Sequence, residues 1–293
     1  MTRRDAAKAL PGAPTTGRFA PSPTGLLHLG HAYSALLAHD GRRAEGGRFL
    51  LRLEDIDPQR CRPEFEAAIL EDLTWLGVRW DAAPRRQSEH WADYRAALAR
   101  LDEAGLLYRC FCTRSEIAAE VARSPSAPHG PEGAPYPGLC KRLDPAEVAD
   151  RLAKGDAYAL RLDTAKALAR CGPLVWHDAE AGAVVARPDL FGDVVLARKD
   201  TPTSYHLAVT VDDALQQITH VVRGRDLFEA THVHRLLQAL LDLPSPLYRH
   251  HALLKGEDGK RYAKRDRSLT LASLRAAGET PATLRQRIGL PPV

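Results

Sequence analysis

A strand, a helix and a second strand follow one another within residues 18–57, and this succession constrains the fold more than any other feature of the chain. RFA at residues 18–20 has the character of a strand end, and residues 28–45 place apolar side chains at helical spacing. RFLLRLEDID, residues 48–57, is a buried-strand pattern that runs into carboxylates. Two strands joined by a helix in this way pair in parallel, so the pattern predicts an α/β fold built on a parallel sheet.

The alternation of helices and strands is interrupted in the middle of the chain and resumes near residue 191. Residues 123–140 hold five prolines and three glycines, which is typical of a loop. Further helices are expected over residues 63–77, 88–105 and 225–241. Further strands of the sheet are expected over DVVLARKD (193–200), YHLAVTVDD (205–213) and ITHVVRG (218–224).

Four segments follow from this organisation. They are a flexible tail (1–17), the first half of a Rossmann-like core (18–108), an insertion (109–190) and the second half of the core with a short C-terminal tail (191–293). No apolar run reaches the length of about 18 residues that a membrane-spanning helix needs. The apolar part of the N-terminal stretch is too short for a secretion signal, so we expect a cytoplasmic monomer without membrane contact.

Two histidines, His28 and His31, stand at the start of the first predicted helix, behind a Pro-Ser-Pro-Thr-Gly turn. In an open parallel sheet, ligands bind beyond the carboxyl ends of the strands, where helix N-termini attract phosphate. The two imidazoles share one helix face, and Gly30 between them would let a flat ring pack on the backbone. The same pair also fits two exposed helix residues or half a metal site.

The distribution of charge bears on what the chain binds, and the cysteine count bears on whether it contains disulfides. The net charge is only +4, but residues 249–267 hold seven Lys or Arg against three acidic residues. Such a patch suits phosphates, although a solvated basic face has the same composition. The five cysteines are an odd number, which argues against a disulfide framework. Cys61 and Cys171 stand apart and are expected to be packed thiols.

Two separated motifs resemble those of one enzyme family. APSPTGLLHLGH, residues 20–31, resembles the HIGH motif of class I aminoacyl-tRNA synthetases, in the form used by the glutamyl and glutaminyl branch. GKRYAKRD, residues 259–266, resembles the KMSKS motif of the same family, with arginine for the first lysine and alanine for the serine. The resemblance extends from Arg18 to about Leu271. It implies the Rossmann-like catalytic core of class I synthetases, and it implies ATP with Mg²⁺.

The resemblance also implies which residues handle ATP. His28, His31 and Lys264 match family positions that stabilise the phosphates during catalysis. Gly30 and Arg261 match positions in the ATP site. Because these groups act by electrostatic stabilisation, the reaction that they imply needs no covalent nucleophile from the protein.

An acidic amino acid is the substrate that the resemblance implies. Glu54 matches the family's ligand for the α-amino group, and Arg18 and Arg223 are the cations that we expect to face two carboxylates. Tyr205 and Ser22 complete the expected glutamate site. Without the resemblance, only Glu54 would be assigned to a site, since isolated arginines and tyrosines are more often surface or packing residues.

Three cysteines, Cys110, Cys112 and Cys140, cluster in the insertion and resemble the zinc site of this family. Thiolates suit one structural Zn²⁺, which usually has four ligands. The resemblance favours Tyr136 as the fourth ligand because of its spacing to Cys140. His129 is the alternative, since imidazole is a far commoner zinc ligand than phenolate.

The length of the chain after the second motif bears on the RNA substrate. Only 29 residues follow Lys264, which is too few for an anticodon-binding domain. The resemblance then implies a ligase that activates L-glutamate with ATP and places it on queuosine in the anticodon of tRNA(Asp). One alternative is a truncated glutamyl-tRNA synthetase that charges a tRNA 3′ end. The other is a non-catalytic RNA-binding relic of the fold.

Overall fold

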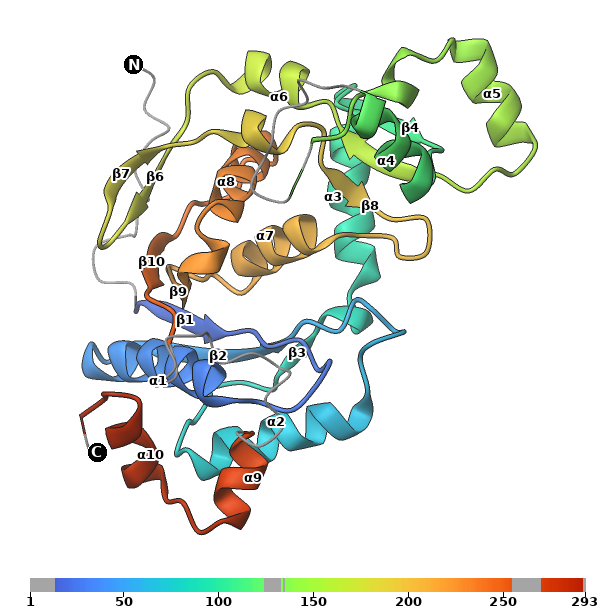
Figure 1. The fold of residues 1–293 in the computed structure, drawn as a ribbon. Coiled ribbons are helices and arrows are strands. Elements are labelled where there is room, and N and C mark those ends of the chain that lie inside the picture. The colour runs from blue at the N-terminus through green and yellow to red at the C-terminus, as the bar shows by residue number, and fades with distance from the viewer. Residues whose placement is uncertain (1–13, 124–132, 134, 255–269, 292–293) are drawn as a thin grey trace.

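A computed structural model describes residues 14–123, 133, 135–254 and 270–291 of the chain. Its centre is a seven-stranded sheet in the order β3-β2-β1-β9-β10-β6-β7 (Figure 1). All neighbouring strands pair in parallel except β6 with β7, which confirms the predicted parallel sheet. The strands are β1 (Thr16–Phe19), β2 (Arg48–Leu53), β3 (Arg85–Arg86), β6 (Val175–Asp178), β7 (Gly182–Val185), β9 (His220–Gly224) and β10 (Leu247–His251).

Helices cover both faces of this sheet. Figure 1 shows α1, α2, α9 and α10 on one side of β1–β3 and α3, α7 and α8 on the other. The helices are α1 (Leu29–Ala44), α2 (Pro63–Trp75), α3 (Trp91–Glu103), α7 (Tyr205–Leu215), α8 (Ala230–Leu240), α9 (Leu271–Ala276) and α10 (Pro281–Arg287). Within the described residues, no helix is both long and apolar enough to cross a membrane.

Strand β2 separates two apolar clusters, one on each face of the central sheet. Phe49 and Leu51 belong to the apolar cluster under α1 and α2, whereas Leu50 belongs to the cluster under α3, α7 and α8. Successive side chains of a strand point to opposite faces, so this run of apolar residues is buried on both sides. The strand ends at Leu53, and the next amide, of Glu54, donates to the carbonyl of Pro21, 3.0 Å away.

A second sheet of three antiparallel-paired strands lies in the order β4-β5-β8. Its strands are β4 (Leu107–Cys110), β5 (Ala159–Leu162) and β8 (Val195–Ala197), and α4 (Arg114–Arg123), α5 (Pro145–Ala153) and α6 (Thr164–Cys171) accompany them. Residues 193–200 thus contain a strand, as expected, but that strand does not join the central sheet. Conversely, β6 and β7 come from within the expected insertion and do join it. The division into domains stays a prediction.

The strand predicted over residues 205–213 is wrong, because this segment is helix α7. Ser204 caps the helix: its hydroxyl accepts from the amide of Leu207 at 3.5 Å. Every residue from His206 to Asp213 is buried, so the run shows no amphipathic periodicity. A short apolar run of this kind cannot be assigned to helix or strand from periodicity alone.

Because α1 is buried against the sheet, truncation of one of its core side chains should destabilise the fold. Leu36 in α1 is 1% exposed, whereas Leu215 in α7 is 54% exposed. We expect Leu36→Ala to lower the free energy of unfolding by about 2–5 kcal/mol, because it leaves a cavity in the core. The matched change Leu215→Ala should alter it by no more than about 0.5 kcal/mol. Urea unfolding of the two variants measures both values, and equal effects would contradict this packing.

Candidate active site

A cavity of about 560 Å³ lies at the carboxyl ends of β1, β2 and β9, beside the first turn of α1. Parallel strands place their carboxyl ends along one edge of the sheet, which is where such folds bind ligands. The structure brings together in this cavity all the residues that the sequence assigned to ATP or glutamate, wherever it describes them. They are Arg18, Ser22, His28, Gly30, His31, Glu54, Tyr205 and Arg223. Their individual roles stay predictions.

The sequence analysis missed several residues of the lining, namely Tyr33, Ser34, Asp226, Leu227, His251, Leu253 and Leu254. Ser34 lies three residues after His31, so helical spacing would have found it. Its Oγ is 2.7 Å from Nε2 of His251 at the end of β10. No local signal identifies His251, since only the pairing of β9 with β10 carries it to the cavity.

The two histidines form the cap of α1. Nδ1 of His28 accepts from the amide of Gly30 at 3.1 Å, and Nδ1 of His31 accepts from the amide of His28 at 3.2 Å. In its neutral form, an imidazole that accepts at Nδ1 carries its proton on Nε2. Nε2–H is a donor, which is what phosphate oxygens bind. The pair therefore stabilises the start of the helix, and both residues also line the cavity.

Two glycines at the cavity are packed closely against neighbouring side chains. A Cβ on Gly30 would lie 3.0 Å from Cε1 of His28, so this glycine makes room for the capping ring. A Cβ on Gly224 would lie 2.5 Å from a carboxylate oxygen of Asp226 and 2.8 Å from a methyl carbon of Leu253. The expected contact of Gly30 with ATP stays a prediction.

Several expected residues lie outside the described part of the chain. These are Arg261 and Lys264, most of the basic patch 249–267, His129 with most of the proline-rich loop, and most of the tail 1–17. The residues that flank 255–269 are described, and both lie at the site. Leu254 lines the cavity, and Thr270 forms a β-bridge with His28.

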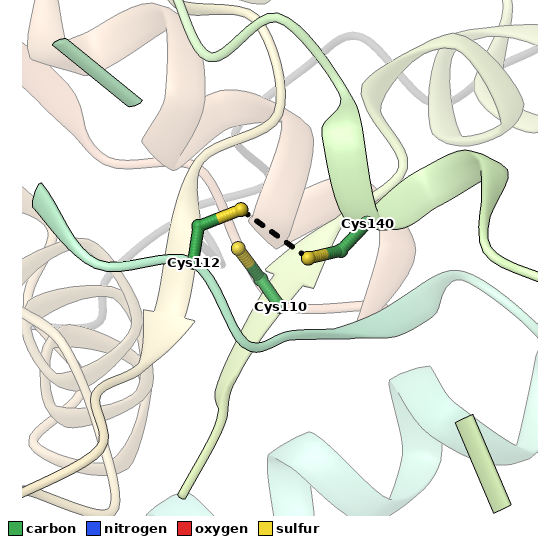
Figure 2. A group of neighbouring side chains, drawn as sticks. All are labelled: Cys110, Cys112 and Cys140. Atoms are coloured by element: carbon green, nitrogen blue, oxygen red, sulfur yellow. Dashed lines mark hydrogen bonds between the residues drawn. The ribbon is translucent and has the colours of Figure 1, made fainter. Parts of the chain in front are cut away.

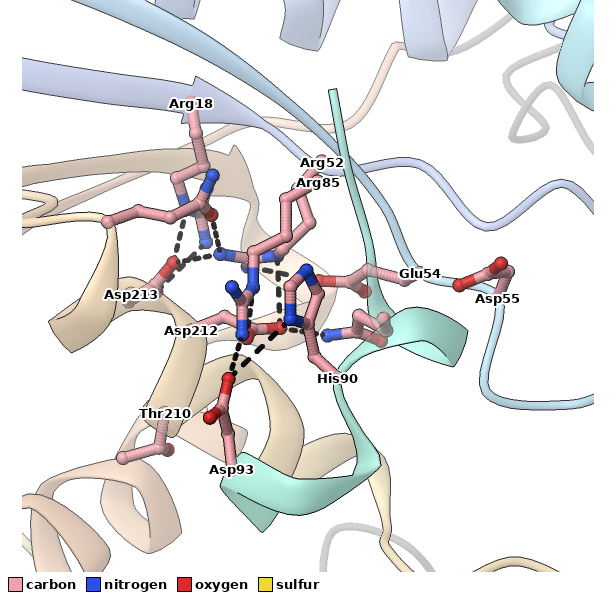
Figure 3. A network of polar contacts seen from close by, with 12 residues as sticks. Arg18, Arg52, Glu54, Asp55, Arg85, His90, Asp93, Thr210, Asp212 and Asp213 are labelled. Atoms are coloured by element: carbon pink, nitrogen blue, oxygen red, sulfur yellow. Dashed lines mark hydrogen bonds and ion pairs between the residues drawn. The ribbon is translucent and has the colours of Figure 1, made fainter. Parts of the chain in front are cut away.

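A buried ion-pair network holds one wall of the cavity (Figure 3). Asp213 of α7 accepts from Nε of Arg18 at 3.0 Å and from Nη1 of Arg52 at 2.7 Å. Nη2 of Arg52 in turn donates to Glu54 at 3.1 Å. The neighbouring Asp212 accepts from Tyr94 and Arg85, so α7 contributes two carboxylates to the network. α7 therefore sets the position of side chains from β1 and β2.

Burial and neighbouring charges shift the pKa values of two carboxylates in this network in opposite directions. Burial alone would raise the pKa of Asp213, but Arg18 and Arg52 hold that pKa below its ordinary value. The pKa of Glu54 is raised, because burial outweighs the attraction of Arg52 and Arg18. Glu54 lines the cavity, so a cationic group beside it would favour its ionised form.

Arg223 supplies a second guanidinium to the cavity, from β9. It is 6% exposed, and its Nη1 donates to the hydroxyl of Tyr205 at 3.3 Å. Tyr205 is the first residue of α7, so the phenol also depends on the start of that helix. Arg18 and Arg223 both line the cavity, and together they give it a strong preference for anionic groups.

A candidate metal site lies in the insertion (Figure 2). The three sulfur atoms of Cys110, Cys112 and Cys140 all lie within 4.8 Å of one another and point to a common centre. The hydroxyl of Tyr136 is 3.3 Å from Sγ of Cys112. The predicted clustering of the cysteines is confirmed, and the buried group can bind a metal ion. Without an ion, burial raises the pKa of the Cys112 thiol to about 11.

Known proteins match this chain over nearly its whole length. Residues 15–291 match the family described as tRNA synthetases class I (E and Q), catalytic domain. The glutamyl-Q tRNA(Asp) synthetase of Rhodobacter capsulatus is 50% identical over 279 residues, which cover 93% of this chain and 99% of that relative. The relative of the same name from Nocardia farcinica is 45% identical, over 96% of this chain and 88% of its own length.

Longer proteins match over about half of their own length. The glutamate–tRNA ligase of Aquifex aeolicus is 38% identical over 91% of this chain and 55% of that relative. The crystal structure of the glutamate-tRNA synthetase from Elizabethkingia anophelis aligns with a TM-score of 0.73 at 29% identity. That alignment covers 87% of this chain and 53% of the solved chain.

The shared carboxylate of the network predicts a large effect on stability. Asp213→Asn removes the charge that two buried arginines share, and we expect a loss of about 3–5 kcal/mol in the free energy of unfolding. Asp200 pairs with Arg198 at the surface, where both side chains are exposed. The control Asp200→Asn should cost no more than about 1 kcal/mol. Denaturant titration compares the two variants, and a small effect at position 213 would refute a structural role for the network.

Proposed function

The chain belongs to the glutamyl-Q tRNA(Asp) synthetase family of class I tRNA synthetases, and we propose that it activates L-glutamate with ATP and transfers it to queuosine in the anticodon of tRNA(Asp). On this proposal, the chain is a ligase. The observation that carries it is the cavity at the sheet edge, where two arginines and one glutamate face the same space beside a helix N-terminus. The 50% identity to a relative of that name supports the choice of RNA.

Glutamate recognition follows from the charges in the cavity. Arg18 and Arg223 would each bind a carboxylate, since a guanidinium forms paired hydrogen bonds with that group. Glu54 would accept from the α-ammonium group, whose positive charge opposes the effect of burial on this carboxylate. Ser22 and the Tyr205 hydroxyl would add hydrogen bonds. A neutral or basic amino acid lacks the second carboxylate, so one of the two guanidinium groups would lose the substrate hydrogen bonds proposed for it, which lowers affinity.

Activation forms a mixed anhydride. An oxygen of the glutamate α-carboxylate attacks the α-phosphorus of ATP, the bond between that phosphorus and the oxygen bridging to the β-phosphorus breaks, and pyrophosphate leaves. His28 and His31 would donate hydrogen bonds from Nε2 to the phosphates, and the N-terminus of α1 adds a favourable dipole. Lys264 and Arg261 are proposed for the same task on the basis of the family motif. Mg²⁺, which accompanies ATP, supplies charge neutralisation on the phosphates.

Transfer completes the reaction. A hydroxyl of the queuosine cyclopentenediol attacks the glutamyl carbonyl carbon, the bond from that carbon to the phosphate oxygen breaks, AMP leaves, and the hydroxyl proton passes to the departing phosphate. A vicinal diol resembles the terminal ribose that other synthetases acylate, so the same core can present it to the adenylate. In this step the residues of the cavity hold the adenylate while the RNA enters.

One structural Zn²⁺ is proposed for the insertion. Cys110, Cys112 and Cys140 would supply thiolates, and Tyr136 is proposed as the fourth ligand because its hydroxyl is 3.3 Å from Sγ of Cys112. A metal at this point would lower the pKa of all four donors. It would hold β4 and the segment before α5 together, which supports a structural role.

The proposed RNA substrate is tested with radiolabelled glutamate and tRNA(Asp) in two forms. We expect label to attach to queuosine-containing tRNA(Asp), including molecules whose terminal ribose was destroyed by periodate before queuosine was installed. We expect none on the unmodified transcript, because it lacks the diol. Robust charging of unmodified tRNA(Glu) would instead identify an enzyme that charges 3′ ends. The absence of charging on any tRNA, together with absent glutamate-dependent ATP–pyrophosphate exchange, would favour a non-catalytic protein.

The fourth zinc ligand is tested by metal analysis. We expect about one zinc per chain in the wild type and a reduced content in Tyr136→Phe, because four-coordination is then incomplete. His129→Ala should keep its zinc. Full zinc in the first variant and loss in the second would show that the histidine is the ligand. Removal of zinc by a chelator should destabilise the insertion, which limited proteolysis detects.

A further inference from the structure

We propose that His250, which does not line the cavity, is a positioning residue that orients the Arg223 guanidinium for a substrate carboxylate, and that Asp178 fixes the tautomer with which it does so. This inference rests on the proposed function, in which Arg223 binds glutamate. It adds two residues from β6 and β10 that neither the sequence motifs nor the cavity lining identify.

The three side chains lie on three adjacent strands. Arg223 and His250 occupy paired positions of β9 and β10, so their side chains emerge side by side. Nε of Arg223 donates to Nε2 of His250 at 3.1 Å. On the far side of the ring, Nδ1 of His250 is 2.7 Å from a carboxylate oxygen of Asp178, at the end of β6. The ring therefore bridges the carboxylate and the guanidinium.

The direction of each hydrogen bond can be assigned from chemistry. An arginine Nε always carries a proton, so Nε2 of His250 must be the acceptor. The proton of the neutral ring then resides on Nδ1, and it is donated to Asp178. A carboxylate can only accept in its ionised form, so it selects this tautomer, as an aspartate does for the histidine of a catalytic triad.

The surroundings keep both groups in these states. Asp178 also accepts from the amides of Glu180, Ala181 and His250, at 2.9, 3.0 and 3.1 Å. Burial opposes ionisation, but these bonds hold the pKa of Asp178 below its ordinary value. Burial and the charge of Arg223 lower the pKa of His250 to about 4. His250 is thus a neutral acceptor at pH 7.

Every acceptor that the described residues offer to Arg223 is neutral. Besides His250 and Tyr205, the guanidinium donates to Oγ1 of Thr231 at 2.7 Å and to the carbonyl of Leu227 at 3.1 Å. His234, whose pKa is lowered well below its ordinary value by burial, lies 3.4 Å away. Within the described residues no carboxylate pairs with Arg223.

This differs from the other buried arginines of the site, since Arg18 and Arg52 both pair with Asp213. Neutral partners orient Arg223 without cancelling its charge. The full charge of Arg223 then remains available for the substrate carboxylate. The orientation of the guanidinium depends on directional acceptors such as His250 rather than on an ion pair.

A packing role for His250 is the competing explanation. The residue is 1% exposed, and the rings of Trp176 and Phe228 pack against it with centroids 5.7 and 5.0 Å away. Replacement by Phe keeps an aromatic ring but removes the acceptor. Replacement by Gln keeps a neutral acceptor and a donor but removes the ring. The two explanations therefore predict opposite orders of damage.

The test measures KM for glutamate and for ATP separately, by ATP–pyrophosphate exchange. We expect His250→Phe to raise KM for glutamate by about tenfold or more, because a hydrogen bond to a charged group is lost. KM for ATP should stay within about twofold, and His250→Gln should keep KM for glutamate within about threefold of wild type. Thr164→Val, which removes the hydrogen bond that the buried Thr164 hydroxyl donates to the carbonyl of Gly192, is the control and should behave as wild type.

Asp178→Asn provides a second test that does not alter the ring. The amide can donate to Nδ1, which moves the imidazole proton to Nε2 and points it at the guanidinium. We expect a rise in KM for glutamate similar to that of His250→Phe, and this test decides if the Phe variant does not fold.

An unchanged KM for glutamate in His250→Phe or Asp178→Asn, or greater damage from Gln than from Phe, would overturn the inference. Absence of glutamate-dependent exchange in the wild type would contradict the proposed function instead.

Discussion

The charge of three buried arginines is the constraint on which the rest of this structure depends. Arg18, Arg52 and Arg223 are each at most 6% exposed, and each is held by several directional bonds. An unpaired buried charge is expensive, so α7 must dock with Asp213 between Arg18 and Arg52. The same docking places Tyr205 beside Arg223. The docking of α7 therefore pairs the charges of Arg18 and Arg52 and also supplies part of the cavity wall.

The local pattern was sufficient to predict the parts of the site that a single βαβ unit builds. The strand, the turn and the helix cap lie within 40 residues, so the local pattern alone places His28 and Glu54 at the same edge of the sheet. The cysteine cluster was also predictable, because its metal-ligand residue types stand close in sequence. Assignment of Arg18, Arg223 and Tyr205 to the substrate requires the family resemblance, since none of the three has a local signal.

The remaining features depend on contacts between distant segments. The sequence predicts a strand where α7 lies, because burial on all sides removes the helical periodicity. The same error hides the role of Asp212 and Asp213 in the ion-pair network. His250 and Asp178 stand 72 residues apart and meet only through the pairing of β10 with β6. Their neutral and ionised states follow from burial and from hydrogen bonds that no sequence pattern records. The segment with Lys264 lies outside the described residues, so its place relative to His28 stays a prediction.

The most direct test of this account is a crystal structure with a non-hydrolysable sulfamoyl analogue of glutamyl-adenylate. We expect the analogue to lie in the cavity between β1, β2, β9 and α1. Its side-chain carboxylate should contact the guanidinium groups of Arg18 or Arg223, its ammonium group should contact Glu54, and its sulfamoyl group should lie beside His28. An analogue bound elsewhere, or one whose carboxylate contacts neither arginine, would contradict the claim that the buried arginines form a glutamate site.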